Sequence, residues 1–276
     1  MTLALRNTIL RVSLASIVIT SVAAAVSLLS LRAPLPTAQE LGVHDMQRWL
    51  FLSWRAESVS PGLLVSGLFT VAGFSVAGAT IIIRYFRKTT APEMLFFLMF
   101  VLAAGFDVWK IGHFVLQMEQ LPVHFAATLT RIVQFAHLFG VLCLFISTLY
   151  LTGVEYQKTG TALSLAALIS LTVVYAIPVD HLTLNPHLVH KIGDETTIQM
   201  VNVVLQLLAI ANVVYAVAYQ RNQEYLVLLP AVLLAIIGRE LVFYLPSIWL
   251  AFAGFAMLVT GAAIFGYRIH TIYLWK

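Results

Sequence analysis

Residues 94–117 read MLFFLMFVLAAGFDVWKIGHFVLQ, and residues 124–152 read HFAATLTRIVQFAHLFGVLCLFISTLYLT. Each run is long enough to cross about 30 Å of hydrocarbon as a helix. Each also carries three polar side chains at intervals of three residues, which a helix places on one face. These are Asp107, Lys110 and His113 in the first run and Arg131, Gln134 and His137 in the second. The two sets are equidistant from Pro122, so an antiparallel hairpin would bring them to matching depths.

Composition extends this membrane assignment to the whole chain. Of its 276 residues, 61% are hydrophobic and only 10% are charged, and the mean hydropathy is +0.93. A soluble domain could not bury so much apolar surface in one core. The sequence therefore predicts an all-α, polytopic integral membrane helix bundle. Its net charge of +4 is dispersed among short loops, which favours a role in topology and argues against a nucleic acid partner.

Eight apolar runs are long enough to be transmembrane helices, and we assign residues 1–276 to a single transmembrane helical domain. The predicted helices span about 10–31, 62–84, 94–117, 124–152, 160–179, 197–219, 225–246 and 249–270. Small residues in two of them predict close helix packing, among them Gly67, Gly73, Gly254 and Gly261.

The distribution of Lys and Arg among the loops predicts an orientation. Basic residues of the termini and the short loops fall on one side, whereas the opposite short loops, 118–123 and 245–248, carry no Lys or Arg. By the positive-inside rule the basic side is cytoplasmic. The residues on this side are Arg6, Arg11, the basic residues within 84–90, Lys158, Arg221, Arg268 and Lys276. Both termini are then cytoplasmic, in what we expect to be a bacterial cytoplasmic (inner) membrane. Residues 10–31 also resemble a cleavable signal peptide, which would leave seven helices, but their length favours a retained anchor.

Two larger loops, 32–61 and 180–196, are expected on the outer side. Within the first, residues 39–54 mix apolar side chains and Trp with charged ones, which predicts a short amphipathic helix at the membrane surface or capping the bundle. The second holds His187 and His190, whose spacing would suit a metal ion on a helix. No second ligand pair supports such a site, so a solvated polar loop is the favoured interpretation.

Polar residues in two later helices extend the opening set. Asn202 and Gln206 share a face with Gln199, and Arg239, Glu240 and Tyr244 lie near the outer end of their helix. We expect four helices to surround one polar cavity that opens outward. Its predicted ligand-binding residues are Asp107, Lys110, His113, Arg131, Gln134, His137, Asn202, Gln206, Arg239, Glu240 and Tyr244.

Charge counting predicts that this cavity is net cationic. Asp107 and Lys110 are close enough on one helix to pair, and Glu240 would answer one of Arg131 and Arg239. The remaining guanidinium would bind a small anionic ligand. The alternative is a structural network that joins the helices and binds no ligand.

Among functional classes, a sensor or receptor-like module that binds a small ligand fits an outward-open cavity best. A proton-coupled or anionic-substrate transporter is the second class, and weaker alternatives are a haem b electron carrier and an intramembrane metal hydrolase. No catalytic signature favours an enzyme, and the sequence identifies no cofactor and no bound metal. The expected partners are membrane lipid, a small anionic ligand and a separate signalling or complex protein.

Overall fold

The computed structural model of the chain has an all-α bundle architecture, as predicted. It describes residues 3–30, 46–49, 52–55, 61–86, 91–119, 122–153, 158–185, 187–220, 223–244 and 247–274. Within these ranges, eight helical segments are long and apolar enough to cross a membrane. All eight correspond to the runs expected from the sequence.

The elements follow one another along the chain with short connections. The α-helices are α1 (Leu3–Ser30), α2 (Pro61–Phe86), α3 (Pro92–Gly105), α4 (Gly112–Met118), α5 (Val123–Leu151), α6 (Thr159–Ala176), α7 (Glu195–Gln220), α8 (Leu228–Tyr244) and α9 (Ile248–Leu274). Two 3₁₀ segments, η1 (Phe106–Ile111) and η2 (Gln223–Val227), lead into α4 and α8. The strands are β1 (Met46–Trp49), β2 (Leu52–Arg55), β3 (Val179–Leu184) and β4 (His190–Ile192).

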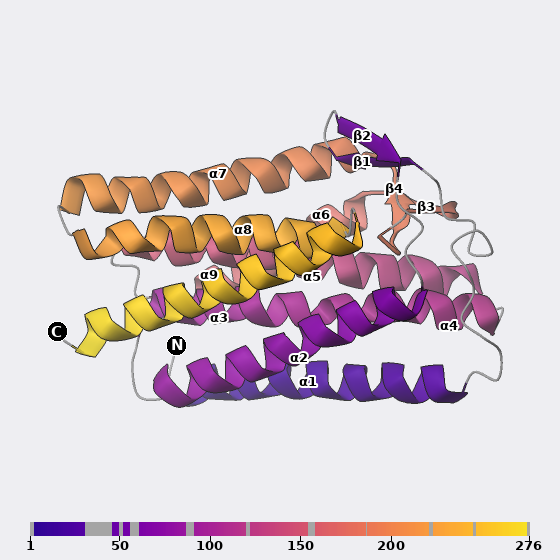
Figure 1. The fold of residues 1–276 in the computed structure, drawn as a ribbon, viewed down its shortest axis with the longest axis horizontal. Helices are drawn as coiled ribbons and strands as arrows, with labels where there is room; N and C mark the ends of the chain where they lie inside the picture. The colour runs from indigo at the N-terminus through magenta and orange to yellow at the C-terminus, as the bar shows by residue number, and fades with distance from the viewer. Residues whose placement is uncertain are drawn as a thin grey trace.

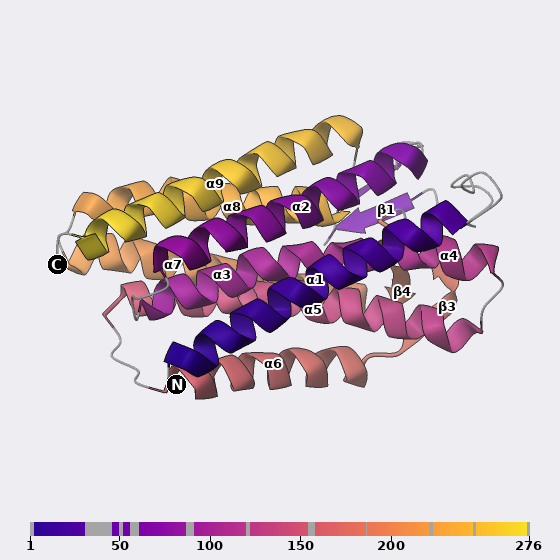
Figure 2. The ribbon, with the colours of Figure 1, turned by 90° about the horizontal axis from the view of Figure 1, so that it is seen from below.

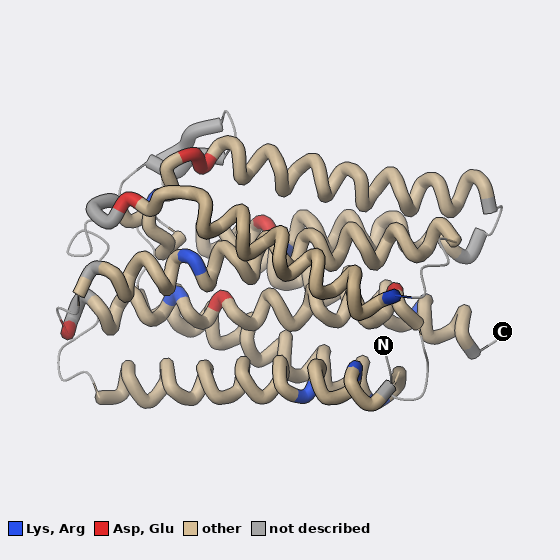
Figure 3. Tube along the Cα trace, turned by 180° about the vertical axis from the view of Figure 1, so that it is seen from behind, with Lys and Arg blue, Asp and Glu red and all other residues tan. Residues whose placement is uncertain are grey.

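The long helices run along the longest axis of the molecule in both ribbon views (Figures 1 and 2). Helix α3 forms the centre of the bundle, because every residue from Glu93 to Gly105 is buried, and it packs most extensively against α5. The two chain termini lie at one end, and the strands lie at the other, which we call the hairpin end (Figure 1). Long stretches of helix carry no charged residue at all (Figure 3).

The segment expected to form a surface helix is different in the structure. Strands β1 and β2 pair in antiparallel register, with Met46 opposite Arg55 and Trp49 opposite Leu52. The prediction of a helix is therefore wrong for residues 46–49 and 52–55, and the rest of 39–54 lies outside the described residues. Leu52 and Trp54 alternate with Ser53 and Arg55, and this period of two is typical of a strand.

The third predicted helix is not regular throughout. Helix α3 ends at Gly105, and the chain continues as the 3₁₀ segment η1 before α4 resumes the α-helical winding. A 3₁₀ helix has three residues per turn, so side chains three apart are eclipsed. Asp107 and Lys110 therefore lie one directly above the other, both buried.

Helices α8 and α9 make the closest contact in the bundle, along a glycine seam formed by Gly238, Gly254 and Gly261. A Cβ on Gly261 would lie 2.6 Å from the carbonyl oxygen of Ala231, and one on Gly254 would lie 2.5 Å from Cβ of Leu241. The packing role predicted for Gly254 and Gly261 is thus confirmed. It is wrong for Gly67 and Gly73, because nothing lies within 4 Å of a Cβ at either position.

Candidate functional site

An ion pair between Asp107 and Arg239 is the central contact inside the bundle. Arg239 on α8 donates from Nη1 to Oδ2 of Asp107 and from Nη2 to Oδ1, the latter over 3.0 Å. Both side chains are buried, and a two-point guanidinium–carboxylate contact is geometrically specific. The pairing expected between Asp107 and Lys110 is therefore replaced by a contact between η1 and α8.

Lys110 uses its charge on the backbone and an aromatic ring. Its ammonium donates to the carbonyl oxygen of Phe243 over 2.7 Å and lies 3.9 Å from the centre of the Phe243 ring. The carbonyl belongs to the last turn of α8, where the negative end of the helix dipole favours a cation. Asp107 and Lys110 thus both attach η1 to α8, one turn apart.

Glu240 is the second carboxylate of the cluster, and its neighbours are neutral or titratable groups. Gln206 on α7 donates from Nε2 to Oε1 of Glu240 over 2.5 Å, and Nε2 of His137 on α5 lies 3.3 Å from the same oxygen. Among the described residues, no Lys or Arg lies within ion-pair distance of Glu240. The expectation that Glu240 pairs with Arg131 or Arg239 is therefore wrong.

The polar face of α7 points into the bundle as its spacing predicted. Gln199, Asn202 and Gln206 are all buried, and Gln199 is hydrogen-bonded to Tyr244 at the end of α8. Neither amide atom of Asn202 has a hydrogen-bond partner within the described part of the chain. Buried polar atoms are normally satisfied, so Asn202 departs from the usual pattern.

Two predicted site residues lie apart from this cluster. Arg131 on α5 is half-buried, and its guanidinium lies 4.9 Å from the ring centre of Tyr175 on α6. His113 on α4 packs against His190 of β4, with ring centres 5.1 Å apart. The structure therefore brings together Asp107, Lys110, His137, Gln206, Arg239, Glu240 and Tyr244. Gln134 is buried on α5, one turn from His137.

The hairpin between β3 and β4 contributes a residue that sequence reasoning placed in solvent. His187 is 1% exposed, and its ring lies 5.2 Å from that of Tyr244 and 5.8 Å from that of Phe243. Leu188, which follows, adopts a positive φ of 58° that a branched side chain rarely accepts. Burial holds the pKa of His187 well below its ordinary value. The predicted solvated loop is therefore wrong at its tip, which is inserted into the bundle.

A groove between α7 and α8 leads to this cluster. It encloses a volume of about 330 Å³ and is lined by apolar side chains along most of its length. Its polar lining comes from Gln206, Glu240 and Tyr244. Glu240 precedes the last residue of α8 by four positions, or about 6 Å of helix rise, so these groups lie toward the hairpin end.

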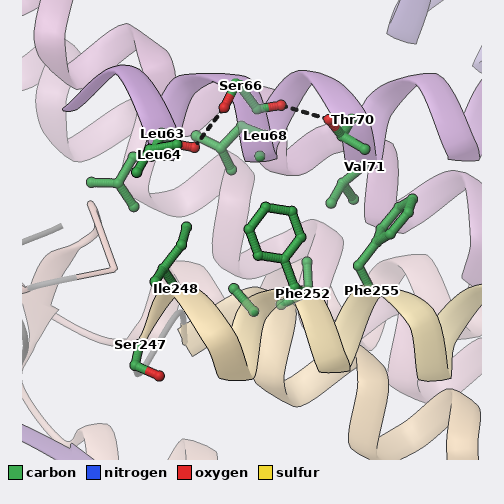
Figure 4. A pocket seen from close by; sticks show the side chains of 13 residues that line it. Leu63, Leu64, Ser66, Leu68, Thr70, Val71, Ser247, Ile248, Phe252 and Phe255 are labelled. Carbon is green, nitrogen blue, oxygen red and sulfur yellow. Dashed lines mark hydrogen bonds between the residues drawn. The ribbon is translucent and has the colours of Figure 1, made fainter. Parts of the chain in front are cut away.

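A second groove, of about 80 Å³, lies between α2 and the start of α9 (Figure 4). Its walls are formed mainly by apolar side chains such as Phe252 and Phe255. The hydroxyl of Ser66 donates to the carbonyl oxygen of Leu63, and that of Thr70 donates to the carbonyl oxygen of Ser66, as the dashed lines show (Figure 4). This groove presents no charged group, so we assign it to helix packing and contact with lipid tails.

Metal binding receives no support from the described ranges, which contain no group of three or more His, Cys, Asp or Glu side chains that could hold an ion. His113 and His137 occupy different surroundings, at β4 and at Glu240 respectively. No model of a known protein family matches the chain, and a search of curated proteins finds no match either. The geometry of the cluster and of the α7–α8 groove is therefore the basis for assigning a function.

Proposed function

We propose that this membrane protein is a receptor-like module that binds a small amphipathic molecule in the α7–α8 groove. The observation that carries the proposal is an acidic side chain, Glu240, at the polar end of an otherwise apolar groove. Its volume of about 330 Å³ is at the lower end of the usual range for small-molecule sites, roughly 300–1,000 Å³. An apolar tail would occupy the groove, and a polar head would reach the cluster.

The cluster supplies a physical link between the groove and the rest of the bundle. Tyr244 lines the groove and also packs against His187 of the β3–β4 hairpin. Glu240 contacts α7 through Gln206 and α5 through His137. A ligand head that engages Glu240 would therefore bear on three helices and on the hairpin, as a receptor requires if binding is to favour one conformation.

The contacts of Arg239 argue against the anionic ligand that the sequence led us to expect in this cluster. Arg239 is engaged by Asp107, and no Lys or Arg is part of the groove lining. Of the predicted site's arginines, Arg131 would be the one left for an anion, but it lies against Tyr175 on α6 and lines neither groove. We therefore place the ligand at Glu240 and treat an anion at Arg131 as a separate hypothesis.

Proton-coupled transport is a second candidate, and the 3₁₀ segment η1 favours it. Interrupted helices with buried charges mark binding sites in many secondary transporters. Here the interruption coincides with Asp107 and Lys110. In proteoliposomes with a pH-sensitive dye inside, a transporter would acidify or alkalinise the lumen when a coupled substrate is added, whereas a receptor would not.

The receptor proposal is tested by photo-cross-linking. A hexadecanol carrying a diazirine on its chain should label peptides from α7 and α8 that line the groove in purified protein reconstituted into nanodiscs. Ile237→Trp should block this labelling, because Ile237 lines the groove and a larger ring would fill it. Leu168→Trp, on the exposed face of α6, is the matched control and should label as the wild type does. Labelling spread evenly over all lipid-facing helices would contradict the proposal.

A further inference from the structure

The two oxygens of Glu240 have different surroundings. Both of its protein contacts, from Nε2 of Gln206 at 2.5 Å and from Nε2 of His137 at 3.3 Å, are made to Oε1. Among the described residues, Oε2 has no hydrogen-bond partner. The side chain is 14% exposed and lines the α7–α8 groove. One carboxylate oxygen is therefore held in place by the protein, and the other is left to accept a hydrogen bond.

The other carboxylates inside the bundle are occupied in ways that Glu240 is not. Both oxygens of Asp107 accept from Arg239. Glu93, at the opposite end of α3, accepts a hydrogen bond of 2.6 Å from the hydroxyl of Tyr273 on α9, and it lines neither groove. Within the described residues, Glu240 is thus the partly buried carboxylate that has an unpaired oxygen and lines a ligand-sized groove.

The charges in the cluster indicate which kind of ligand group would bind the free oxygen of Glu240. Asp107 is matched by Arg239, and Lys110 lies on the carbonyl oxygen and the ring of Phe243. The direct contacts of Glu240 are an amide and an imidazole, and the guanidinium of Arg239, which is engaged by Asp107, acts on it only at longer range. A buried carboxylate is strongly stabilised by a donor that is itself charged, and it repels a second carboxylate.

We propose that the α7–α8 groove selects molecules with an apolar chain and a primary ammonium head, which donates a hydrogen bond to Oε2 of Glu240. This inference rests on the function proposed above and names its ligand class. The ammonium would supply a charged donor in direct contact with Oε2 of Glu240, where the protein places none. The chain would run along Leu207, Ile210, Leu233 and Ile237 of the groove walls.

The test compares two probes that differ only in the head. Hexadecylamine and hexadecanoic acid, each with a diazirine at the same carbon, are added to protein in phosphatidylcholine nanodiscs, because choline carries no N–H donor. Groove peptides of α7 and α8 should be labelled about tenfold more by the amine, as expected for one charge-assisted hydrogen bond. Equal labelling, or stronger labelling by the acid, would overturn the inference.

Two matched variants assign the preference to one side chain. Glu240→Gln keeps the shape and the contact with Gln206 but loses the charge, so the amine should lose its advantage over the acid. Glu93→Gln removes a carboxylate at the far end of the bundle and should keep the advantage. If Glu240→Gln is not monodisperse, competition on the wild type decides: excess unlabelled hexadecylamine should abolish labelling by the amine probe, and sodium hexadecanoate should not. Competition by both alike, or by neither, would contradict the assignment.

The same experiment separates the sources of an ammonium head and separates this inference from the proposed function. If phosphatidylethanolamine in the nanodisc displaces the amine probe, the natural ligand class includes aminophospholipids; if only free hexadecylamine does, it is a single-chain amine, and either result supports the ammonium. The hexadecanol probe tests the groove without regard to charge. Groove labelling by hexadecanol without a preference for the amine would refute the ammonium and leave the groove standing, whereas no groove labelling by any probe would refute both.

Discussion

Arg239 and Asp107 are 132 positions apart in the sequence and form a buried two-point ion pair inside the bundle. The pair fastens the irregular part of the third membrane crossing to α8. Both partners are buried away from water, so each charge is stabilised chiefly by the other.

Removing one partner should cost far more than removing both. Asp107→Ala leaves a buried guanidinium uncompensated, and we expect a loss of about 3–5 kcal/mol of stability. The double variant Asp107→Ala with Arg239→Leu should recover most of it. Thermal unfolding in detergent measures both. As a control, Asp107→Ala with Lys110→Met should show no such recovery, because Lys110 bonds to Phe243. Recovery with Lys110→Met but not with Arg239→Leu would mean that Lys110 is the true partner.

The two arginines of the predicted site should respond differently to Arg→Gln. Arg131→Gln removes a cation–π contact with Tyr175, worth roughly 0.5–2 kcal/mol, from a half-buried position. Arg239→Gln leaves Asp107 buried without its cation and should lower the melting temperature much more. The ratio of monodisperse to aggregated protein on size exclusion gives an independent readout. Similar losses for both variants would argue against the assigned contacts.

The buried hairpin tip predicts acid sensitivity. The folded-state pKa of His187 lies below its ordinary value of 6.5, so below pH 6.5 the unfolded chain binds more protons than the folded protein. Its contribution to stability is therefore full above about pH 6.5 and is lost as the pH falls. His187→Phe should flatten the fall in melting temperature between neutral pH and about pH 5.

The surroundings of His187 support the direction of that effect. Lys110 and His137 face it with positive or titratable charge, and both lower its pKa further. The nearby carboxylates are Glu195, which contacts Asn185 at the base of the hairpin, and Glu240, which lies one turn before Tyr244. His124→Phe, at an exposed position at the start of α5, is the control and should keep the acid sensitivity of the wild type. An unchanged profile in His187→Phe would show that other groups cause it.

The glycine seam should not accept a methyl group. In Gly261→Ala the new Cβ would meet backbone atoms of α8 at 2.6 and 2.7 Å, and backbone cannot move aside as a flexible side chain can. Overpacking of this kind costs about 1–3 kcal/mol. Gly67→Ala places its Cβ in open space and serves as the control, with a melting temperature equal to or above that of the wild type. Equal melting temperatures for the two variants would contradict the seam.

The predicted orientation can be checked with single cysteines. Cys143, the one native cysteine, is fully buried and should not react with a membrane-impermeant maleimide. Cysteine placed at Asp194 should be labelled in intact cells, and cysteine placed at Lys158 only after the membrane is opened. Labelling of both positions in intact cells would contradict the predicted orientation.

The sequence was sufficient for the membrane crossings and for the inward direction of the polar side chains, because both follow from local spacing and hydropathy. It could not determine the partners of those side chains. Asp107 is near Lys110 along the chain, yet Arg239 reaches it by helix packing that no local pattern encodes. The burial of His187 was likewise unpredictable, since it results from a hairpin folding back onto α8. The clearest local signal that was misread was the period of two in residues 52–55, which fits a strand.

The 3₁₀ segment η1 is longer than an α-helix of the same number of residues would be. Six residues rise about 12 Å in a 3₁₀ helix and about 9 Å in an α-helix, and the two windings differ by about 120° of rotation over that distance. Rewinding η1 would thus draw α4 inward by about 3 Å and turn it by a third of a revolution. The contacts from Asp107 to Arg239 and from Lys110 to Phe243 oppose this rewinding, because both hold η1 against the last turns of α8.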